Sequence, residues 1–375
     1  MNFTKLDDFM QEMVKRGYPS CELAVTKDGE TVYRTSVGYS DAAGTRPAGN
    51  TDLYWIFSCS KIITCIAGLR LLEEAKISLD DPVSKYLPEF SGMRVAQADG
   101  TTLPAKNQIT IQQLFTMTSG LTYNTKTPSL INAITPEATT RDIVRAMADD
   151  PLAFEPGTHY LYSLSHDVLG AVIEEVSGMP LSMYMKKYIF DPLGLRDIGF
   201  RPSEDQLSRF ADMYVGRSGT CVSEQIPCKN EYCFSSQYDS GGAGLFSSVD
   251  DYIKILTAIA NGGKTPDGYS ILRPETIALA EKSLLHDDAL NDFCQGRLFG
   301  YGWGLCGRVH RDPDISFSLS PVGEFGWDSA ANAFALIDTK NRVALFFGAH
   351  VRSYTYGYHY VHPKMRNLLY ECLES

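Results

Sequence analysis

Ser58 and Lys61 form an S-x-x-K pattern directly before an apolar stretch with helical periodicity. Residues three apart on a helix share one face, so the hydroxyl and the amine would lie side by side. A serine becomes a useful nucleophile when a neighbour accepts its proton, and a partly desolvated amine can do that or stabilise the group that does. The pattern therefore predicts nucleophilic catalysis by Ser58, although a capping serine and a surface lysine would share the same spacing.

The sequence around this pattern resembles the serine β-lactamase, D,D-peptidase and esterase family, in particular its class C-like branch. The likeness begins at residues 53–88 and continues in order through further landmarks: I-T-I-Q-Q-L-F-T-M-T-S-G-L at 109–121, G-G-A-G-L-F-S-S at 241–248 and G-Y-G-W-G at 300–304. These segments span nearly the whole chain, and S-x-x-K is a motif of this group. The resemblance implies that Ser58 is the nucleophile and Lys61 its lysine partner.

The second family motif, Y-x-N, reads Tyr162-Ser163-Leu164 here. The resemblance implies that Tyr162 lies over the nucleophile, with Tyr160 the nearest alternative. Beside a protonated lysine, the phenolate of Tyr162 would be stabilised, and it could take the serine proton and return it to the leaving group. Leu164 replaces an asparagine that helps to hold the substrate, a change that is commoner among esterase-like members. We expect Leu164 to contact substrate.

The third family motif, K-T-G or H-x-G, matches Gly326-Trp327-Asp328-Ser329-Ala330. Trp327 takes the place of the cation, and we expect Trp327, Asp328 and Ser329 to contact substrate. The backbone N–H groups of Ser58 and Ala330 would form an oxyanion hole, because that role belongs to the peptide group and survives side-chain changes. The motif here lacks its cation and carries the carboxylate of Asp328 instead. Both changes argue against efficient recognition of penicillins.

These features predict a serine hydrolase that acts through an acyl-enzyme on small esters or amides. Its partner would be a small-molecule ester, amide or peptide, and no cofactor or metal is expected. Other functions stay open on the same residues. They are β-lactamase, D-amino-acid peptidase or penicillin-binding activity, acyl transfer to an alcohol or amine, and ligand binding by a catalytically idle homologue.

The elements that must position these residues are of two kinds. Strands are expected near both chain ends, as a hairpin of 21–27 and 31–37 turning at Asp28-Gly29 and as runs at 314–320, 332–338 and 342–349. Helices are expected at 3–14, 61–74, 110–117, 140–147, 167–176 and after Pro363. We predict an α+β fold of the β-lactamase/transpeptidase type, with an antiparallel sheet flanked by helices. A discontinuous sheet lobe would comprise 1–75 and 236–375, and a mostly helical lobe 76–235.

Composition sets the remaining limits on this chain of 375 residues. It is 44% hydrophobic with a formal charge of −11, a balance that disfavours nucleic acid and anionic membranes as partners. The first residues lack the features of a secretory signal, and no apolar run reaches membrane-spanning length, so a soluble cytoplasmic protein is expected. The nine cysteines suggest free thiols. The cluster of Cys221, Cys228 and Cys233 matches no common zinc spacing.

Overall fold

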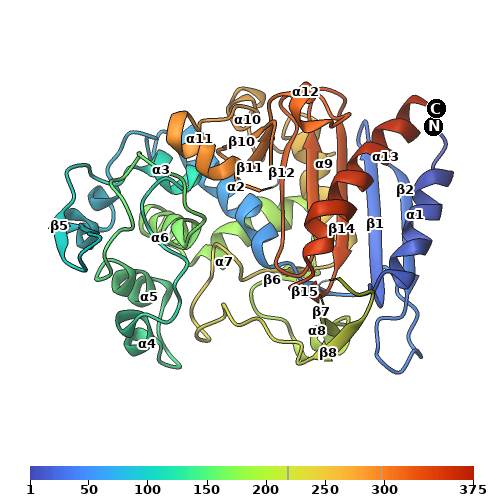
Figure 1. Ribbon diagram of the computed structural model, residues 1–375, viewed down its shortest axis with the longest axis horizontal. Helices are drawn as coiled ribbons and strands as arrows, with labels where there is room; N and C mark the ends of the chain where they lie inside the picture. Colours follow the sequence, from blue (N-terminus) through green and yellow to red (C-terminus); the bar gives the residue numbers. More distant parts are fainter. Residues whose placement is uncertain (218, 297) are drawn as a thin grey trace.

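The computed structural model describes residues 1–217, 219–296 and 298–375, and a seven-stranded antiparallel sheet lies at its centre. The strand order is β10-β11-β12-β13-β14-β1-β2. Their bounds are β1 Ser20–Lys27, β2 Glu30–Gly38, β10 Tyr301–Gly304, β11 Gly307–His310, β12 Phe325–Asp328, β13 Phe334–Asp338 and β14 Val343–Ala349. Because β1 pairs with β14, the two chain ends build one sheet (Figure 1).

Helices cover both faces of this sheet. α1 (Thr4–Lys15) and α13 (His362–Glu374) pack on one face, while α9 (Val249–Ala260) packs on the other. Strand β14 shows the period-2 alternation behind this arrangement. Leu345 and Phe347 belong to the apolar core with α1 and α13, whereas Phe346 stacks on Tyr252 of α9 with ring centroids 4.1 Å apart.

The middle of the chain is mostly helical. Four of its α-helices lie to the left in Figure 1, namely α3 Ile111–Thr116, α4 Pro128–Ala133, α5 Thr140–Met147 and α6 Ser165–Ser177. Further along the chain, α7 (Leu181–Met185) lies nearer the centre of the view, and α8 (Glu204–Ser208) lies at its lower edge beside β8. Two short strands, β4 (Arg94–Ala96) and β5 (Thr102–Pro104), form a ribbon at the outer end. The structure confirms the predicted α+β fold, and the exact lobe boundaries stay a prediction.

Helix α2 (Ser60–Glu73) connects the two regions. Eleven of its residues are buried, which is the pattern of a helix surrounded by protein rather than lying on a surface. Two small sheets lie nearby, β3-β9-β6 and β15-β7-β8. Their strands are β3 Tyr54–Trp55, β6 Ile198–Gly199, β7 Met213–Gly216, β8 Ser223–Ile226, β9 Phe246–Ser247 and β15 Val351–Arg352. The pairing of β3 with β9 fixes the chain that leads into Ser58.

Most predicted elements are confirmed to within a few residues, but the predicted strand at 314–320 is wrong. The chain there forms the short helix α12 (Pro313–Ser316), which the side chain of Asp312 caps by accepting backbone N–H bonds. Phe317 then adopts a left-handed φ of +54° and ends the turn. The apolar side chains that suggested a strand are exposed, with Phe317 80% accessible. The two other helices of this region are α10 (Pro274–Ala280) and α11 (Asp287–Cys294).

Candidate active site

Ser58 lies in a single 3₁₀ turn, η1 (Phe57–Cys59), that leads into α2. Lys61 follows in the first turn of α2, and its Nζ is 3.4 Å from Ser58 Oγ, so the spacing does place both groups together. Both side chains are buried, and Lys61 is only 2% exposed. Phe57, directly before Ser58, has a φ of +41°. Backbone strain of this kind is concentrated at functional sites.

The amine of Lys61 has three polar neighbours. It donates a 2.7 Å hydrogen bond to the carbonyl of Gly242, lies 3.4 Å from the hydroxyl of Tyr123, and lies 3.4 Å from Ser58 Oγ. The amine also lies over the rings of Tyr162 and Tyr123, at 4.6 and 5.2 Å. Burial lowers the pKa of Lys61 to about 8, while the charge of Asp167 opposes that shift.

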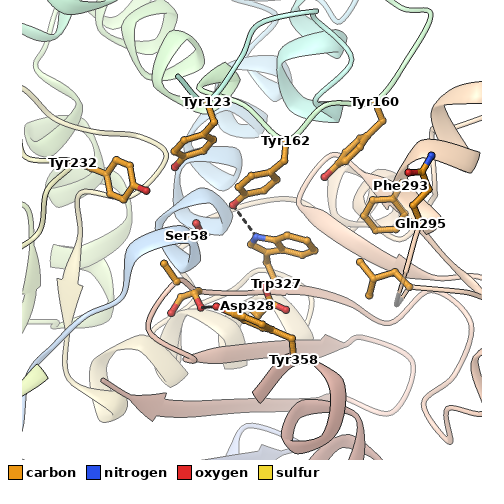
Figure 2. A pocket seen from close by; sticks show the side chains of 13 residues that line it. Ser58, Tyr123, Tyr160, Tyr162, Tyr232, Phe293, Gln295, Trp327, Asp328 and Tyr358 are labelled. Carbon is orange, nitrogen blue, oxygen red and sulfur yellow. Dashed lines mark hydrogen bonds between the residues drawn. The ribbon is translucent and has the colours of Figure 1, made fainter. Parts of the chain in front are cut away.

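Tyr162 lies over Ser58 in a cage of aromatic rings (Figure 2). The indole N–H of Trp327 donates a 3.0 Å hydrogen bond to the Tyr162 hydroxyl. Burial raises the pKa of Tyr162 well above its usual value, and hydrogen bonds with Ser58 and Trp327 oppose this effect. The Tyr162 ring stacks on Tyr123 with centroids 5.5 Å apart and planes 1° from parallel. Tyr162 is therefore a neutral phenol in the resting site.

Backbone pairing between two loops positions this tyrosine pair. The N–H of Leu164 donates to the carbonyl of Thr122, and the N–H of Leu161 donates to the carbonyl of Met117. These bonds hold the segment before α6 beside the segment after α3, which brings the two rings face to face. The capping box at Thr110 fixes the start of α3 and so the position of its following loop.

Strand β12 brings the third-motif residues to the nucleophile. Its pairing with β11 ends at Gly326, and the carbonyl of the next residue, Trp327, lies 3.8 Å from Cys59 Sγ in the turn η1. Asp328 Oδ2 lies 3.8 Å from the Nδ1 atom of His362. Ser329 is buried, and its hydroxyl accepts backbone N–H bonds from Ala331 and Ala333, so its side chain shapes the turn that carries Ala330.

These residues line a pocket of about 430 Å³, and about half of its wall residues are aromatic. The wall is formed by Ser58, Tyr123, Tyr160, Tyr162, Tyr232, Phe293, Gln295, Leu298, Trp327, Asp328, Ser329, Ala330 and Tyr358. Figure 2 shows Tyr123 and Tyr232 on one side of Tyr162, with Tyr160 and Phe293 on the other. The pocket is thus built by both the sheet and the helical region.

Of the four residues predicted to contact substrate, Leu164 is the one that does not line this pocket. It is 5% exposed and lies in the helical core, where it faces a separate small void beside Leu121, Leu130 and Met147. Its position just before α6 turns its side chain away from Ser58. The prediction that Leu164 contacts substrate is therefore not supported.

Sequence reasoning missed several pocket residues. Tyr123 stands two residues after the T-S-G-L landmark, so its place in that segment was a usable signal. Gly242 lies inside the G-G-A-G-L landmark, but its role depends on its backbone carbonyl, whose position cannot be inferred from the residue type. Tyr232 lies in a loop, Phe293 in α11 and Tyr358 in a helical turn just before α13, and none of them belongs to a family motif. Within the described ranges, no group of three or more His, Cys, Asp or Glu residues is arranged to hold a metal ion.

Comparison with known proteins agrees with this geometry. A family model described as Beta-lactamase matches residues 6–352. The chain belongs to the beta-lactamase family. Among relatives in this family, it is 32% identical to Esterase EstB of Burkholderia gladioli, over 85% of this chain and 82% of that protein. It is also 33% identical to Lovastatin esterase of Penicillium rubens, over 64% of each chain.

A solved structure superposes on nearly the whole chain. The structure titled "EstCE1, a hydrolase with promiscuous acyltransferase activity" has a TM-score of 0.82 and 25% identity, covering 98% of this chain and 97% of that one. Family, relatives and fold confirm the prediction of an esterase-like serine hydrolase. No helix in the described parts of the chain is long and apolar enough to cross a membrane.

Proposed function

We propose that Ser58 is the nucleophile and that Lys61, as a neutral amine, is the base that takes its proton. A neutral amine offers two N–H donors and one lone pair. The three polar neighbours of Lys61 match this set, because Gly242 O and Tyr123 Oη can accept the two hydrogens while the lone pair faces Ser58. The lowered pKa of Lys61, about 8, supports this assignment because a general base works best near the ambient pH.

Tyr162 acts in this proposal as the acid that protonates the leaving group. Its raised pKa keeps the proton on the phenol at neutral pH, so the phenolate role suggested by the sequence is less favoured. The proton taken by Lys61 can return through Tyr162 as the acyl–oxygen bond breaks. Water then attacks the acyl-enzyme, with the same groups working in reverse.

The oxyanion of each tetrahedral intermediate would be held by the N–H groups of Ser58 and Ala330. Ala330 lines the pocket, and its N–H donates no hydrogen bond to any residue within the described ranges. An unpaired backbone donor at a pocket wall is available for a developing negative charge. The Ser329 hydroxyl supports that turn from behind, which keeps the donor in place.

The preferred substrates are small esters with an apolar acyl or alcohol group, and the observation that carries this proposal is Trp327. In the third motif it replaces a cation with an indole that faces the aromatic pocket and bonds Tyr162. The wall therefore offers ring surface to the substrate at this position rather than a positive charge. Esterase names among the relatives support the same class.

A comparison of substrates tests this assignment. Purified protein should hydrolyse p-nitrophenyl acetate and butyrate, and Ser58→Ala should lose that activity by about a thousandfold or more. Turnover of nitrocefin should be weaker by at least about a hundredfold in kcat/KM, because the cation of the third motif is missing. Ester turnover that survives in Ser58→Ala would show that the proposed mechanism is wrong.

Acyl transfer is a second candidate, favoured by the aromatic pocket wall, which can stack an apolar acceptor in competition with water. One structural neighbour is described as a hydrolase with promiscuous acyltransferase activity. Adding benzyl alcohol during turnover of p-nitrophenyl butyrate should yield benzyl butyrate if the acyl-enzyme is shielded from water. Formation of butyrate alone would leave hydrolysis as the only activity.

We also propose a reducing, cytoplasmic location, since all nine cysteines of this chain are free thiols. Disulfides persist mainly in oxidising compartments. Titrating the denatured, unreduced protein, freshly purified from its native host, with a thiol reagent should count nine thiols. A smaller count that returns to nine after reduction would contradict this location.

A further inference from the structure

A buried carboxylate lies close to Lys61 without forming a direct ion pair with it. Asp167, in the first turn of α6, is 1% exposed. Its Oδ1 atom accepts three hydrogen bonds, from the hydroxyls of Tyr238 (2.6 Å) and Ser240 (2.7 Å) and from the N–H of Gly242 (3.3 Å). Its Oδ2 atom is buried and has no hydrogen-bond partner in the described parts of the chain. All three donors bind the same oxygen, so they hold the carboxyl group in one orientation.

Gly242 joins this carboxylate to Lys61. Its N–H donates to Asp167, and its carbonyl accepts the 2.7 Å hydrogen bond from the Lys61 amine. A methyl group on Gly242 would lie 2.4 Å from Asp167 Oδ2 and 3.4 Å from Lys61 Nζ. The glycine therefore fills the space between the carboxyl group and the amine, and no side chain can be added there without displacing one of them.

Asp167 is also the only carboxyl group among the described titratable groups that act on the amine. The others are Tyr123, Tyr162, His166, Cys59 and Cys65. Burial raises the pKa of both tyrosines and both thiols, so these four stay neutral. Burial lowers the pKa of His166 to about 3, so it is neutral too. The carboxylate thus opposes the desolvation that would otherwise make the amine a weaker base.

We propose that Asp167 is a positioning residue that holds the Lys61 amine beside Ser58 through Gly242 and balances its charge. This role rests on the proposed function, in which Lys61 is the base. Asp167 does not line the pocket, so it acts through the lysine. Two hydroxyls from the segment after β8 keep the carboxylate oriented toward that glycine.

Asp167→Asn tests this role, because it removes the charge while keeping the shape and an oxygen that can accept from Tyr238. We expect the pH profile of kcat/KM for p-nitrophenyl butyrate to keep its acidic limb, but with the midpoint about one pH unit lower. The plateau should fall about tenfold, since a weaker base is less effective. In protein labelled with carbon-13 lysine, the Lys61 Cε signal, assigned by its loss in Lys61→Arg, should titrate at the same lower pH.

Asp239→Asn is the matched control, since Asp239 is an equally buried carboxyl group that lies between Tyr238 and Ser240 and pairs with Arg201 instead. It should leave the midpoint where it is in the unaltered protein. A folded Asp167→Asn protein with an unmoved midpoint and an unmoved Lys61 titration would overturn the proposal. If that variant does not fold, Asp167→Ser, which also removes the carboxyl group, should lower the midpoint in the same direction, and an unchanged midpoint there would overturn the proposal as well.

These experiments distinguish failure of the role proposed for Asp167 from failure of the proposed function. Loss of ester turnover in Ser58→Ala, together with an unmoved midpoint in Asp167→Asn, would retain Ser58 as nucleophile and reject only the role of Asp167. Ester turnover that does not depend on Ser58 would reject the proposed function itself.

Discussion

The indole N–H of Trp327 donates a 3.0 Å hydrogen bond to the hydroxyl of Tyr162. One residue belongs to the sheet and the other to the helical region, so this bond joins the two walls of the pocket. It also occupies one lone pair of the phenol oxygen, which orients the Tyr162 proton away from the indole. Trp327 therefore places a neutral N–H donor at a position where the family pattern has a cation.

Trp327→Phe should lower kcat for p-nitrophenyl butyrate about tenfold, because the ring remains but the donor to Tyr162 is lost. The measurement is kcat and KM at the plateau pH, with the melting temperature as a control for folding. In a Tyr162→Phe background the same change should cost much less, since the acceptor is already absent. Equal losses in both backgrounds would mean that the hydrogen bond has no catalytic role.

Activity should rise with pH through a midpoint near 8, because burial lowers the pKa of Lys61 to about 8. Below that pH the amine is protonated and cannot accept the Ser58 proton, so kcat/KM should fall tenfold per pH unit. A profile from pH 6 to 10 measures this directly. Activity that stays constant down to pH 6 would contradict Lys61 as the base.

Tyr123→Phe should reduce kcat/KM only a few-fold, about two- to fivefold, because the ring still stacks on Tyr162 while one weak acceptor for Lys61 is lost. Tyr123→Ala should reduce kcat/KM about a hundredfold, since it removes the ring that stacks on Tyr162 and holds it in place. Steady-state kinetics of the two variants decide the point. A larger loss in Tyr123→Phe than in Tyr123→Ala would show that the hydroxyl, and not the stack, is what matters.

Glu324→Gln should destabilise the protein by about 3 kcal/mol, because Glu324 is fully buried and forms an ion pair with the buried Arg308. Burial acts to raise the pKa of Glu324, but Arg308 and Arg366 outweigh it and lower the pKa. The stabilisation from this pair is therefore present above the unfolded pKa and is lost as pH falls through the lower folded value. Urea unfolding at pH 7 and pH 3 should show the difference between the two proteins shrinking at the lower pH.

Glu371→Gln is the matched control for this pair. Glu371 bonds Lys5 at the exposed end of α13, where water screens the interaction. Its loss should leave the urea midpoint nearly unchanged at pH 7. A large shift of the urea midpoint in Glu371→Gln, or no shift in Glu324→Gln, would contradict the expectation that the buried pair stabilises the protein more than the exposed one.

The sequence could predict what depends on local spacing. Ser58 and Lys61 face each other because three residues on a helix span less than one turn, and the Asp28-Gly29 hairpin follows from its turn residues. The prediction of a strand at 314–320 is wrong because exposed apolar residues such as Phe317 give the same alternating pattern as a strand with one buried face. Burial is a property of the whole fold and cannot be read from one segment.

Contacts between distant segments could not be predicted in this way. The stack of Tyr123 on Tyr162 and the bond from Lys61 to the Gly242 carbonyl join residues 39 and 181 positions apart. Leu164 was placed in the pocket by its motif, but the backbone just before α6 turns it into the helical core. Motif order therefore located the nucleophile and the strand beside it, while packing determined which side chains form the pocket wall.

The most direct test of the central claim is covalent labelling of the nucleophile. A fluorophosphonate reacts with an activated serine and leaves a phosphonyl group that mass spectrometry can place on one peptide. We predict a single adduct on Ser58, absent from Ser58→Ala and formed much more slowly in Lys61→Arg. An adduct on another residue, or ester hydrolysis that continues in fully active protein without any labelling, would contradict the account.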